Sequence, residues 1–202
     1  MIALIDYGIG NLRSVEKAFN AVGAQVELTD DPAVIAAADQ VVLPGVGAFG
    51  DGMAGLKERD LVEVIKTTVS RGTPLLGICL GMQLLFESSD ELGAHTGLGM
   101  LPGRVKRFPD LGQKIPQTGW NQVIIKRESP LIYGLEQGDY AYFNHSHYCE
   151  PALETDSIAV TDYGLTYASI VGRNWLYGVQ FHPEKSQSVG LLILRNFVER
   201  CS

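Results

Sequence analysis

The chain has 202 residues, of which 46% are hydrophobic and 19% are charged, proportions that indicate a globular rather than a disordered protein. Sixteen Lys and Arg residues against 23 Asp and Glu residues give a net charge of −7, which argues against binding to nucleic acid or to a membrane surface. No apolar stretch approaches the ~20 residues of a membrane span, and the N-terminus lacks the features of a signal peptide. The three cysteines are widely separated, which favours a reducing, cytoplasmic setting over disulfides or a zinc site.

Strands and helices are expected to alternate through the first half of the chain. Short apolar runs predict strands over residues 2–5, 25–29, 40–43 and 74–78. Helical spacing of apolar residues predicts helices over residues 11–22, 32–38, 61–70 and 80–87. This alternation predicts parallel strands joined by helical crossovers, with helices on both faces of the sheet.

The second half of the chain is expected to be rich in strands. The pattern predicts strands over residues 121–126, 140–149, 157–162, 166–171 and 175–181, with a hairpin turn at residues 172–174 and a last helix over residues 189–200. We therefore expect an α/β fold in which a mixed, mostly parallel central sheet carries antiparallel additions, and a single domain over residues 1–202.

The strongest chemical signal is the segment Gly77-Ile78-Cys79-Leu80-Gly81, between a predicted strand and a predicted helix. It is a glycine-x-nucleophile-x-glycine elbow with cysteine as the nucleophile. Glycines on either side leave room for a tight, strained turn. A position at the start of a helix favours the thiolate form of Cys79. The segment predicts a cysteine nucleophile, although a buried structural cysteine is the simpler alternative.

A cysteine nucleophile needs a base, and the base needs a group that orients it. His182 follows a predicted strand, and Glu184 comes two residues later, on the same side of an extended chain. We expect His182 to be the general base and Glu184 to orient it. His145 and His147 are instead expected to be core or substrate-lining residues, because no third ligand accompanies them as a metal pair.

An acyl-transfer site also needs donors for the oxyanion. One is expected to be the N–H of Leu80, directly after the nucleophile. The glycine-rich loop over residues 45–52 follows another strand, and its peptides around Val46 and Gly47 are expected to supply the second donor. A flexible surface loop is the alternative interpretation of this segment.

These motifs resemble those of the triad (class I) glutamine amidotransferases, and the resemblance covers the whole chain. Further motifs narrow it to the glutaminase subunits of imidazole glycerol phosphate synthases. The sequence departs from this pattern at Thr118, Asn144 and His147, where methionine, an apolar residue and an aromatic residue are expected. The segments that carry the resemblance are residues 6–12, 43–49, 77–85, Gly119-Trp120-Asn121, Tyr142-Phe143, His145-Ser146 and residues 181–186.

The resemblance implies the three-layer fold of this family and hydrolysis of L-glutamine to glutamate and ammonia, without a metal or cofactor. It further implies that ammonia passes to a separate (β/α)₈-barrel cyclase subunit in a one-to-one complex. That partner makes imidazole glycerol phosphate in histidine biosynthesis, and no synthase domain is expected in this chain. The family pattern places the glutamine at Gln83, Glu91, His145 and Ser146, and the interface and ammonia passage at Trp120, Asn121, Tyr142 and Lys185.

Three other functions remain as alternatives. The chain could serve another triad amidotransferase, such as one that makes anthranilate, carbamoyl phosphate, guanylate or pyridoxal phosphate. It could also be a thiol hydrolase or esterase on an elbow scaffold, which an ester-hydrolysis assay would distinguish. A regulatory subunit without activity would require a broken triad, whereas Cys79, His182 and Glu184 are all present.

Overall fold

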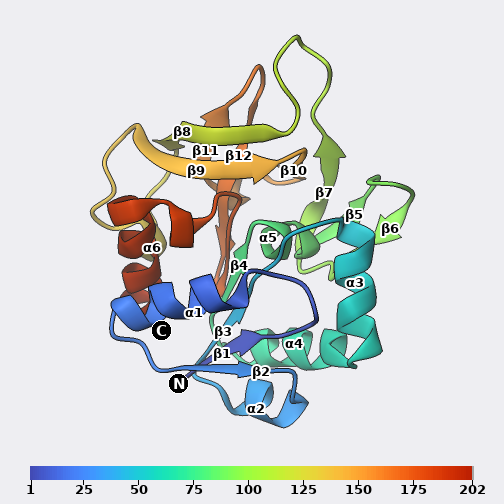
Figure 1. The fold of residues 1–202 in the computed structure, drawn as a ribbon, viewed down its shortest axis with the longest axis vertical. Coiled ribbons are helices and arrows are strands. Elements are labelled where there is room, and N and C mark those ends of the chain that lie inside the picture. The colour runs from blue at the N-terminus through green and yellow to red at the C-terminus, as the bar shows by residue number, and fades with distance from the viewer. Residues whose placement is uncertain (202) are drawn as a thin grey trace.

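The computed structural model describes residues 1–201 and contains one mixed sheet with helices on both sides (Figure 1). Along its main path the strands follow the order β2-β1-β3-β4-β13-β12-β10-β7-β5-β6, and β11, β8 and β9 branch from β12. The strands are β1 (Ile2–Ile5), β2 (Val26–Thr29), β3 (Gln40–Leu43), β4 (Leu75–Ile78), β5 (Phe86–Ser89), β6 (His95–Thr96), β7 (Leu101–Arg107), β8 (Gln117–Ile125), β9 (Asp139–His145), β10 (His147–Pro151), β11 (Ser157–Asp162), β12 (Thr166–Arg173) and β13 (Leu176–Val179).

The centre of the sheet is parallel, and its other parts are mainly antiparallel. Strands β2, β1, β3, β4 and β13 all run in the same direction. The neighbours β13, β12, β10 and β7 then alternate in direction, as do β12, β11, β8 and β9. The expectation of a mixed α/β sheet with antiparallel additions is confirmed.

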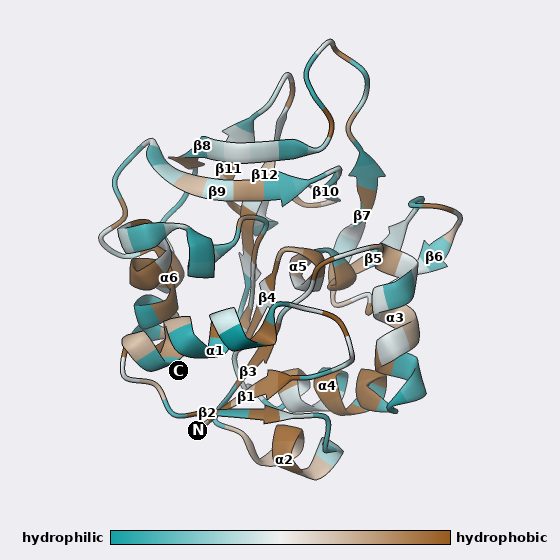
Figure 2. Cartoon of the chain, in the orientation of Figure 1, coloured by the Kyte–Doolittle hydropathy of each residue, from teal (hydrophilic) through white to brown (hydrophobic). Residues whose placement is uncertain are grey.

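Both faces of the central strands are covered, which explains their continuous apolar sequences. Successive residues of a strand point to opposite faces, so Ile2 and Leu4 pack in one core cluster while Ala3 and Ile5 pack in the other. Figure 2 shows the same contrast, since the central strands are hydrophobic along their length and the helices are hydrophobic along only part of theirs.

The helices divide between these two clusters. Helices α1 and α6 contribute Val15, Phe19, Leu194 and Phe197 to the cluster that contains Ile2, whereas α2 to α5 line the other. The helices are α1 (Leu12–Ala21), α2 (Pro32–Ala37), α3 (Phe49–Glu58), α4 (Leu61–Ser70), α5 (Leu80–Leu84) and α6 (Gln187–Arg200), with 3₁₀ turns at η1 (Pro130–Ile132), η2 (Glu154–Asp156) and η3 (Pro183–Lys185).

The structure corrects several predicted boundaries. The helix predicted over residues 80–87 ends at Leu84, and the chain continues as β5, whose residues pair with β7 in the sheet. The predicted loop over residues 45–52 becomes helical from Phe49. The single strand predicted over residues 140–149 is divided at Ser146 into β9 and β10, which pair with different neighbours.

Among residues 1–201, no helix combines the length and apolar character needed to cross a membrane.

Phe197 joins α6 to the sheet and to α1. Its side chain is fully buried, and its ring centroid lies 6.3 Å from that of Phe19 and 6.5 Å from that of Tyr177. We predict that Phe197→Ala lowers the free energy of unfolding by about 3–5 kcal/mol, because it leaves a cavity between three elements. Urea unfolding measures this change. The control is Leu111→Ala, which removes a half-exposed side chain and should change stability by no more than about 0.5 kcal/mol. Equal losses in both variants would contradict the packing role given to Phe197.

Candidate active site

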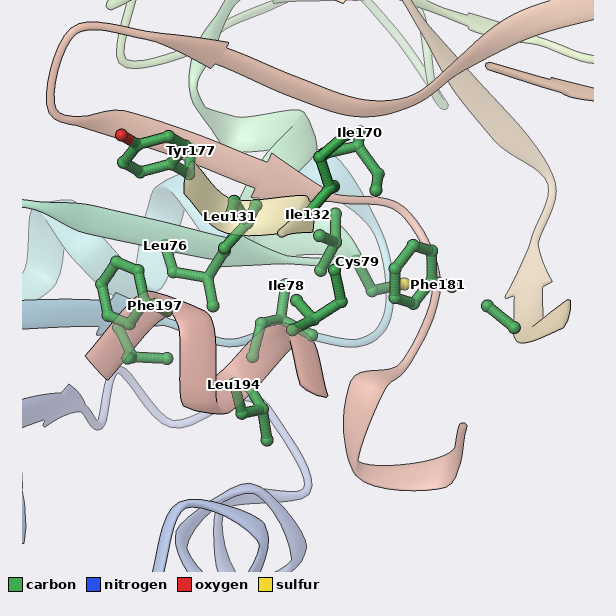
Figure 3. Packing of buried hydrophobic residues seen from close by; sticks show 14 of the residues in the cluster. Leu76, Ile78, Cys79, Leu131, Ile132, Ile170, Tyr177, Phe181, Leu194 and Phe197 are labelled. Atoms are coloured by element: carbon green, nitrogen blue, oxygen red, sulfur yellow. The ribbon is translucent and has the colours of Figure 1, made fainter. Parts of the chain in front are cut away.

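Cys79 lies at the junction of β4 and α5, in a backbone conformation that L-residues rarely adopt. Its φ of 54° and ψ of −110° lie outside the strand and helix regions. The neighbouring strand β13 fixes one side of this turn, because the Cys79 N–H donates to the Val179 carbonyl at 2.8 Å. The side chain is buried within the core cluster, beside Phe181 in the close-up of Figure 3. A strained residue held between two elements fits a nucleophile elbow.

The two glycines of the elbow are required by backbone contacts. A Cβ atom on Gly81 would lie 1.8 Å from the Leu43 carbonyl oxygen, and one on Gly77 would lie 2.7 Å from the Gly81 oxygen. These contacts involve main-chain atoms of β3, β4 and α5, which have no flexible end to move away. The glycines therefore let the elbow pack directly against the neighbouring strand.

His182 is brought beside Cys79 by the parallel pairing of β13 with β4. In this register Val179 lies opposite Ile78, so the residues that follow β13 lie beside the elbow that follows β4. Main-chain bonds then hold His182, whose N–H donates to the Tyr142 carbonyl at 2.9 Å and whose carbonyl accepts from the Ser186 hydroxyl at 2.7 Å.

The carboxylate of Glu184 faces the imidazole of His182. The Glu184 Oε1 atom lies 2.9 Å from His182 Nδ1, and the carboxylate is almost completely buried. Its Oε2 atom has no hydrogen-bond partner among residues 1–201, so the imidazole is the group that balances this carboxylate. With Nδ1 directed at Glu184, the opposite edge of the ring is the one left for the sulfur of Cys79.

The charge state of His182 follows from these neighbours. Burial lowers the pKa of this imidazole, but hydrogen bonds to Cys79 and Glu184 and their charges raise it more, to about 10. At neutral pH the ring therefore carries two protons in the resting site. An imidazolium beside Cys79 favours the thiolate of that residue and is itself ready to donate a proton.

These side chains open into a cavity of about 230 Å³. The size suits a ligand about as large as an amino acid, and polar groups line most of the wall. The lining residues are Val46, Gly47, Cys79, Leu80, Gln83, Glu91, Pro116, Asn144, His145, Ser146, His147, His182 and Lys185.

The expected oxyanion residues Leu80, Val46 and Gly47 all line this cavity. The loop is anchored at Pro44, whose carbonyl accepts a hydrogen bond from the buried Tyr7 hydroxyl at 2.5 Å. Beyond this anchor Val46 is 40% exposed and Gly47 has a φ of +98°, a left-handed conformation that suits glycine. The hydrogen bond at Pro44 therefore fixes where this segment begins, while Gly47 allows a peptide next to it to rotate.

Four residues expected around the substrate also line the cavity, namely Gln83, Glu91, His145 and Ser146. Glu91 accepts hydrogen bonds from the Phe49 N–H at 2.8 Å, and its other oxygen lies 3.2 Å from His147 Nδ1. The Gln83 amide nitrogen is occupied by two internal hydrogen bonds, which leaves its oxygen as the atom available to a ligand. The carboxylate of Glu91 and the oxygen of Gln83 are both suited to bind an ammonium group.

His145 is the second histidine of the cavity, and its environment differs from that of His182. Burial lowers the pKa of His145 to about 4, although the hydrogen bond between Nδ1 and the His147 carbonyl, at 2.7 Å, raises it in part. The other ring nitrogen faces the Tyr167 hydroxyl rather than a carboxylate. The neutral imidazole can donate only one hydrogen bond, and the carbonyl requires that proton on Nδ1.

Three of the four residues expected at the interface lie together. Trp120 and Tyr142 are cross-strand partners in β8 and β9 with ring centroids 6.1 Å apart, and the Lys185 amine lies 5.9 Å from the Tyr142 ring. Asn121 does not line the cavity, because its amide donates to the Asp162 carbonyl at 2.8 Å. This cluster forms a half-exposed aromatic surface next to the cavity.

The three departures from the family pattern are not isolated changes. Thr118 and Asn144 are opposite each other in β8 and β9, and the threonine hydroxyl donates to the Asn144 side chain at 3.2 Å. His147 contacts Glu91, with its Nδ1 atom 3.2 Å from a carboxylate oxygen. In residues 1–201 no group of three or more His, Cys, Asp or Glu side chains has the arrangement of a metal site, so His145 and His147 find no third ligand there.

Sequence reasoning did not identify Gln180 or Tyr7 as site residues. Gln180 is fully buried and its amide nitrogen lies 3.8 Å from Cys79 Sγ. The alternation of a strand could have found it, since Gln180, His182 and Glu184 follow every second position. Tyr7 has no comparable signal, because its contact with the loop at Pro44 depends on the pairing of β1 with β3.

Comparison with known proteins finds similarity over almost the whole chain. The family model of the glutamine amidotransferases, class I, matches residues 3–201. The chain is 52% identical to the imidazole glycerol phosphate synthase subunit HisH of Syntrophotalea carbinolica, with 98% of each chain covered. It is 53% identical to the HisH subunit of Moorella thermoacetica, covering 98% of this chain and 94% of that one.

Solved structures of other glutamine amidotransferases share the fold. A protein described as a glutamine amidotransferase superposes with a TM-score of 0.75 at 17% identity, over 96% of this chain and 99% of that one. PurLQS from Thermotoga maritima superposes with a TM-score of 0.74 at 17% identity, over 100% of this chain and 98% of that one. At these identities the agreement concerns the arrangement of the elements.

We predict that Gly81→Ala strongly destabilises the protein, because its Cβ atom would overlap the Leu43 carbonyl oxygen. The expected loss in the free energy of unfolding is about 3 kcal/mol, at the upper end of the cost of overpacking. Gly112→Ala is the matched control, since a Cβ atom there meets no neighbour and only the left-handed backbone contributes, at about 1–2 kcal/mol. Urea unfolding compares the two variants, and a smaller loss in Gly81→Ala than in Gly112→Ala would count against a close-packed elbow.

His145 gives the stability of the protein a defined dependence on pH. Its pKa is about 4 in the folded protein, below the usual 6.5, so its contribution is complete above pH 6.5 and is lost as the pH falls from 6.5 to 4, when the unfolded chain takes up the proton. The loss amounts to about 3 kcal/mol. We predict that His145→Asn, which keeps a donor for the His147 carbonyl, loses less stability than the wild type between pH 7 and pH 4.5. Urea unfolding at pH 7 and at pH 4.5 measures the loss for each protein. Equal losses in the wild type and in His145→Asn would refute the prediction.

Proposed function

This chain belongs to the class I glutamine amidotransferase family, and we propose that it is the glutamine-hydrolysing subunit of an imidazole glycerol phosphate synthase, acting in histidine biosynthesis. The observation that carries the proposal is that Cys79 and His182 line a cavity the size of an amino acid, with the buried Glu184 carboxylate in contact with His182. The high identity to HisH subunits over nearly the whole chain supports this choice over the other triad amidotransferases. The intact Cys-His-Glu set argues against a regulatory subunit without activity.

In the first half of the reaction, the Cys79 sulfur attacks the side-chain carbonyl carbon of glutamine. The carbonyl electrons move to the oxygen, and the N–H of Leu80 with a peptide N–H near Val46 or Gly47 stabilises the resulting oxyanion. His182, which is protonated in the resting site, gives its proton to the amide nitrogen. The C–N bond breaks, ammonia leaves, and a thioester joins the glutamyl group to Cys79.

In the second half, the neutral imidazole left by this transfer acts as the general base. His182 takes a proton from water, and the hydroxide adds to the thioester carbon. Collapse of this intermediate breaks the C–S bond and releases glutamate and the Cys79 thiolate. Glu184 stabilises the imidazolium whenever it forms and keeps the ring in one orientation through the contact at 2.9 Å.

The amino-acid end of glutamine is bound by other residues that line the cavity. The Glu91 carboxylate and the Gln83 oxygen accept from the α-ammonium group, and main-chain groups around His145 and Ser146 complete the site. His147 holds the Glu91 carboxylate in place through the contact at 3.2 Å. The Phe49 N–H donates to the second oxygen of Glu91 and fixes it from the other side.

The ammonia is delivered to a (β/α)₈-barrel cyclase subunit bound in a one-to-one complex. The surface that supports this assignment is the half-exposed cluster of Trp120, Tyr142 and Lys185, which adjoins the cavity through Lys185. Exposed aromatic side chains of this kind are typical of protein interfaces. The products of the coupled reaction are imidazole glycerol phosphate and an aminoimidazole carboxamide ribonucleotide.

We predict that Cys79→Ala separates the two activities of the complex. Glutamine-dependent synthesis should fall by about 10⁴-fold or more, because the nucleophile is lost, whereas synthesis from added ammonium should persist. Both rates are measured with the cyclase partner and its nucleotide substrate present. Cys201→Ala is the control, because Cys201 is also buried but lies at the end of α6 and outside the cavity, and it should retain both activities. Equal loss of both activities in Cys79→Ala would instead give Cys79 a role in folding or assembly.

A further inference from the structure

A chain of buried amide groups connects the main chain of β10 to the sulfur of Cys79. The Gln83 Nε2 atom lies 3.0 Å from the His147 carbonyl oxygen and 3.2 Å from Gln180 Oε1. The Gln180 Nε2 atom in turn lies 3.8 Å from Cys79 Sγ. None of these three contacts takes part in the reaction steps described above.

The hydrogen bonds fix the orientation of both glutamine side chains. The His147 carbonyl can only accept, so the Gln83 atom that faces it must be the nitrogen. That nitrogen has a second hydrogen directed at Gln180, and the Gln180 atom that receives it must therefore be the oxygen. The nitrogen of Gln180 is left on the other side of the amide, where it faces Cys79. The sulfur thus meets an N–H donor rather than a carbonyl oxygen.

Burial makes this orientation costly to change. Gln180 is fully buried and Gln83 is 4% exposed, so water cannot replace either hydrogen bond. Within residues 1–201 the Cys79 sulfur is the one acceptor that the Gln180 amide nitrogen has. The backbone of Gln180 is also held, because its N–H donates to the Ser169 carbonyl at 2.9 Å. A rotated Gln180 amide would place its oxygen against the sulfur and its nitrogen against that of Gln83.

We propose that Gln180 is a further catalytic residue, whose amide N–H stabilises the Cys79 thiolate, and that Gln83 is the positioning residue that keeps this amide in its donating orientation. A donor favours the charged form of the sulfur, whereas a carbonyl oxygen would favour the protonated thiol. The proposal rests on the function assigned to Cys79 above. It gives Gln83 a second role beside the one its oxygen has toward the substrate.

Alkylation by iodoacetamide tests the proposal on the folded, full-length chain. Mass spectrometry of the peptide that contains Cys79 separates its reaction from those of Cys149 and Cys201. Gln180→Met keeps the length of the side chain but removes the donor, and we expect Cys79 to react about tenfold more slowly at pH 7, the change expected for one hydrogen bond to a charged group. The difference in alkylation rate between Gln180→Met and the wild type should become smaller as the pH is raised, because alkali forms the thiolate without the donor. A structural defect would not be repaired in this way.

Gln83→Met tests the positioning role, and Gln40→Met is the matched control. Gln83→Met frees the Gln180 amide to rotate and should slow alkylation by a smaller factor. Gln40 is a buried glutamine that donates to the Phe197 carbonyl at 2.7 Å, away from the cavity, and Gln40→Met should alkylate at the rate of the wild type. The proposal would be overturned if a folded Gln180→Met or Gln83→Met variant alkylated Cys79 at the rate of the wild type. Because alkylation needs neither glutamine nor the partner, this result is distinct from a failure of glutamine hydrolysis.

Discussion

The site depends on the parallel pairing of β13 with β4. This pairing joins segments about a hundred residues apart, since Gln180 and Cys79 are separated by 101 positions. It places Val179 beside Ile78, and the residues that follow the two strands then meet at the same edge of the sheet. The nucleophile Cys79 follows β4. The donor Gln180 and the base His182 both follow β13. A shift of one residue in this register would turn Gln180 and His182 away from the sulfur.

The same edge must hold Cys79 in an unfavourable backbone conformation, and close packing supplies the constraint. The elbow cannot relax toward β3, because Gly81 already lies against the Leu43 carbonyl. It cannot relax toward β13, because its N–H is bonded to the Val179 carbonyl. Strain of this kind persists where surrounding structure fixes the backbone on several sides. The parallel centre of the sheet, buried on both faces, provides that rigidity.

Local patterns in the sequence predicted the chemistry better than they predicted the neighbouring elements. The elbow around Cys79 and the spacing of His182 and Glu184 could be identified because each lies within a few residues of the chain. The end of helix α5 at Leu84 could not, because a run of buried apolar residues looks the same in a helix and in a strand. Alternation along the strand could have pointed to Gln180 as a site residue, but its role as a donor to Cys79 could not be predicted. Its side chain acquires meaning only from the register of β13 and from the orientation that Gln83 imposes on it.

Two histidines in one cavity illustrate how neighbours, rather than burial, assign roles. His145 and His182 are both buried, and burial by itself lowers the pKa of each imidazole. His145 meets a carbonyl and a hydroxyl and stays neutral, whereas His182 meets the Glu184 carboxylate and Cys79 and is charged. A second imidazolium would be repelled by the first, so the neutral form of His145 lets the charge of His182 act on the sulfur alone. The pair therefore works as one charged and one neutral group, and only the charged one is placed to give a proton to the leaving ammonia.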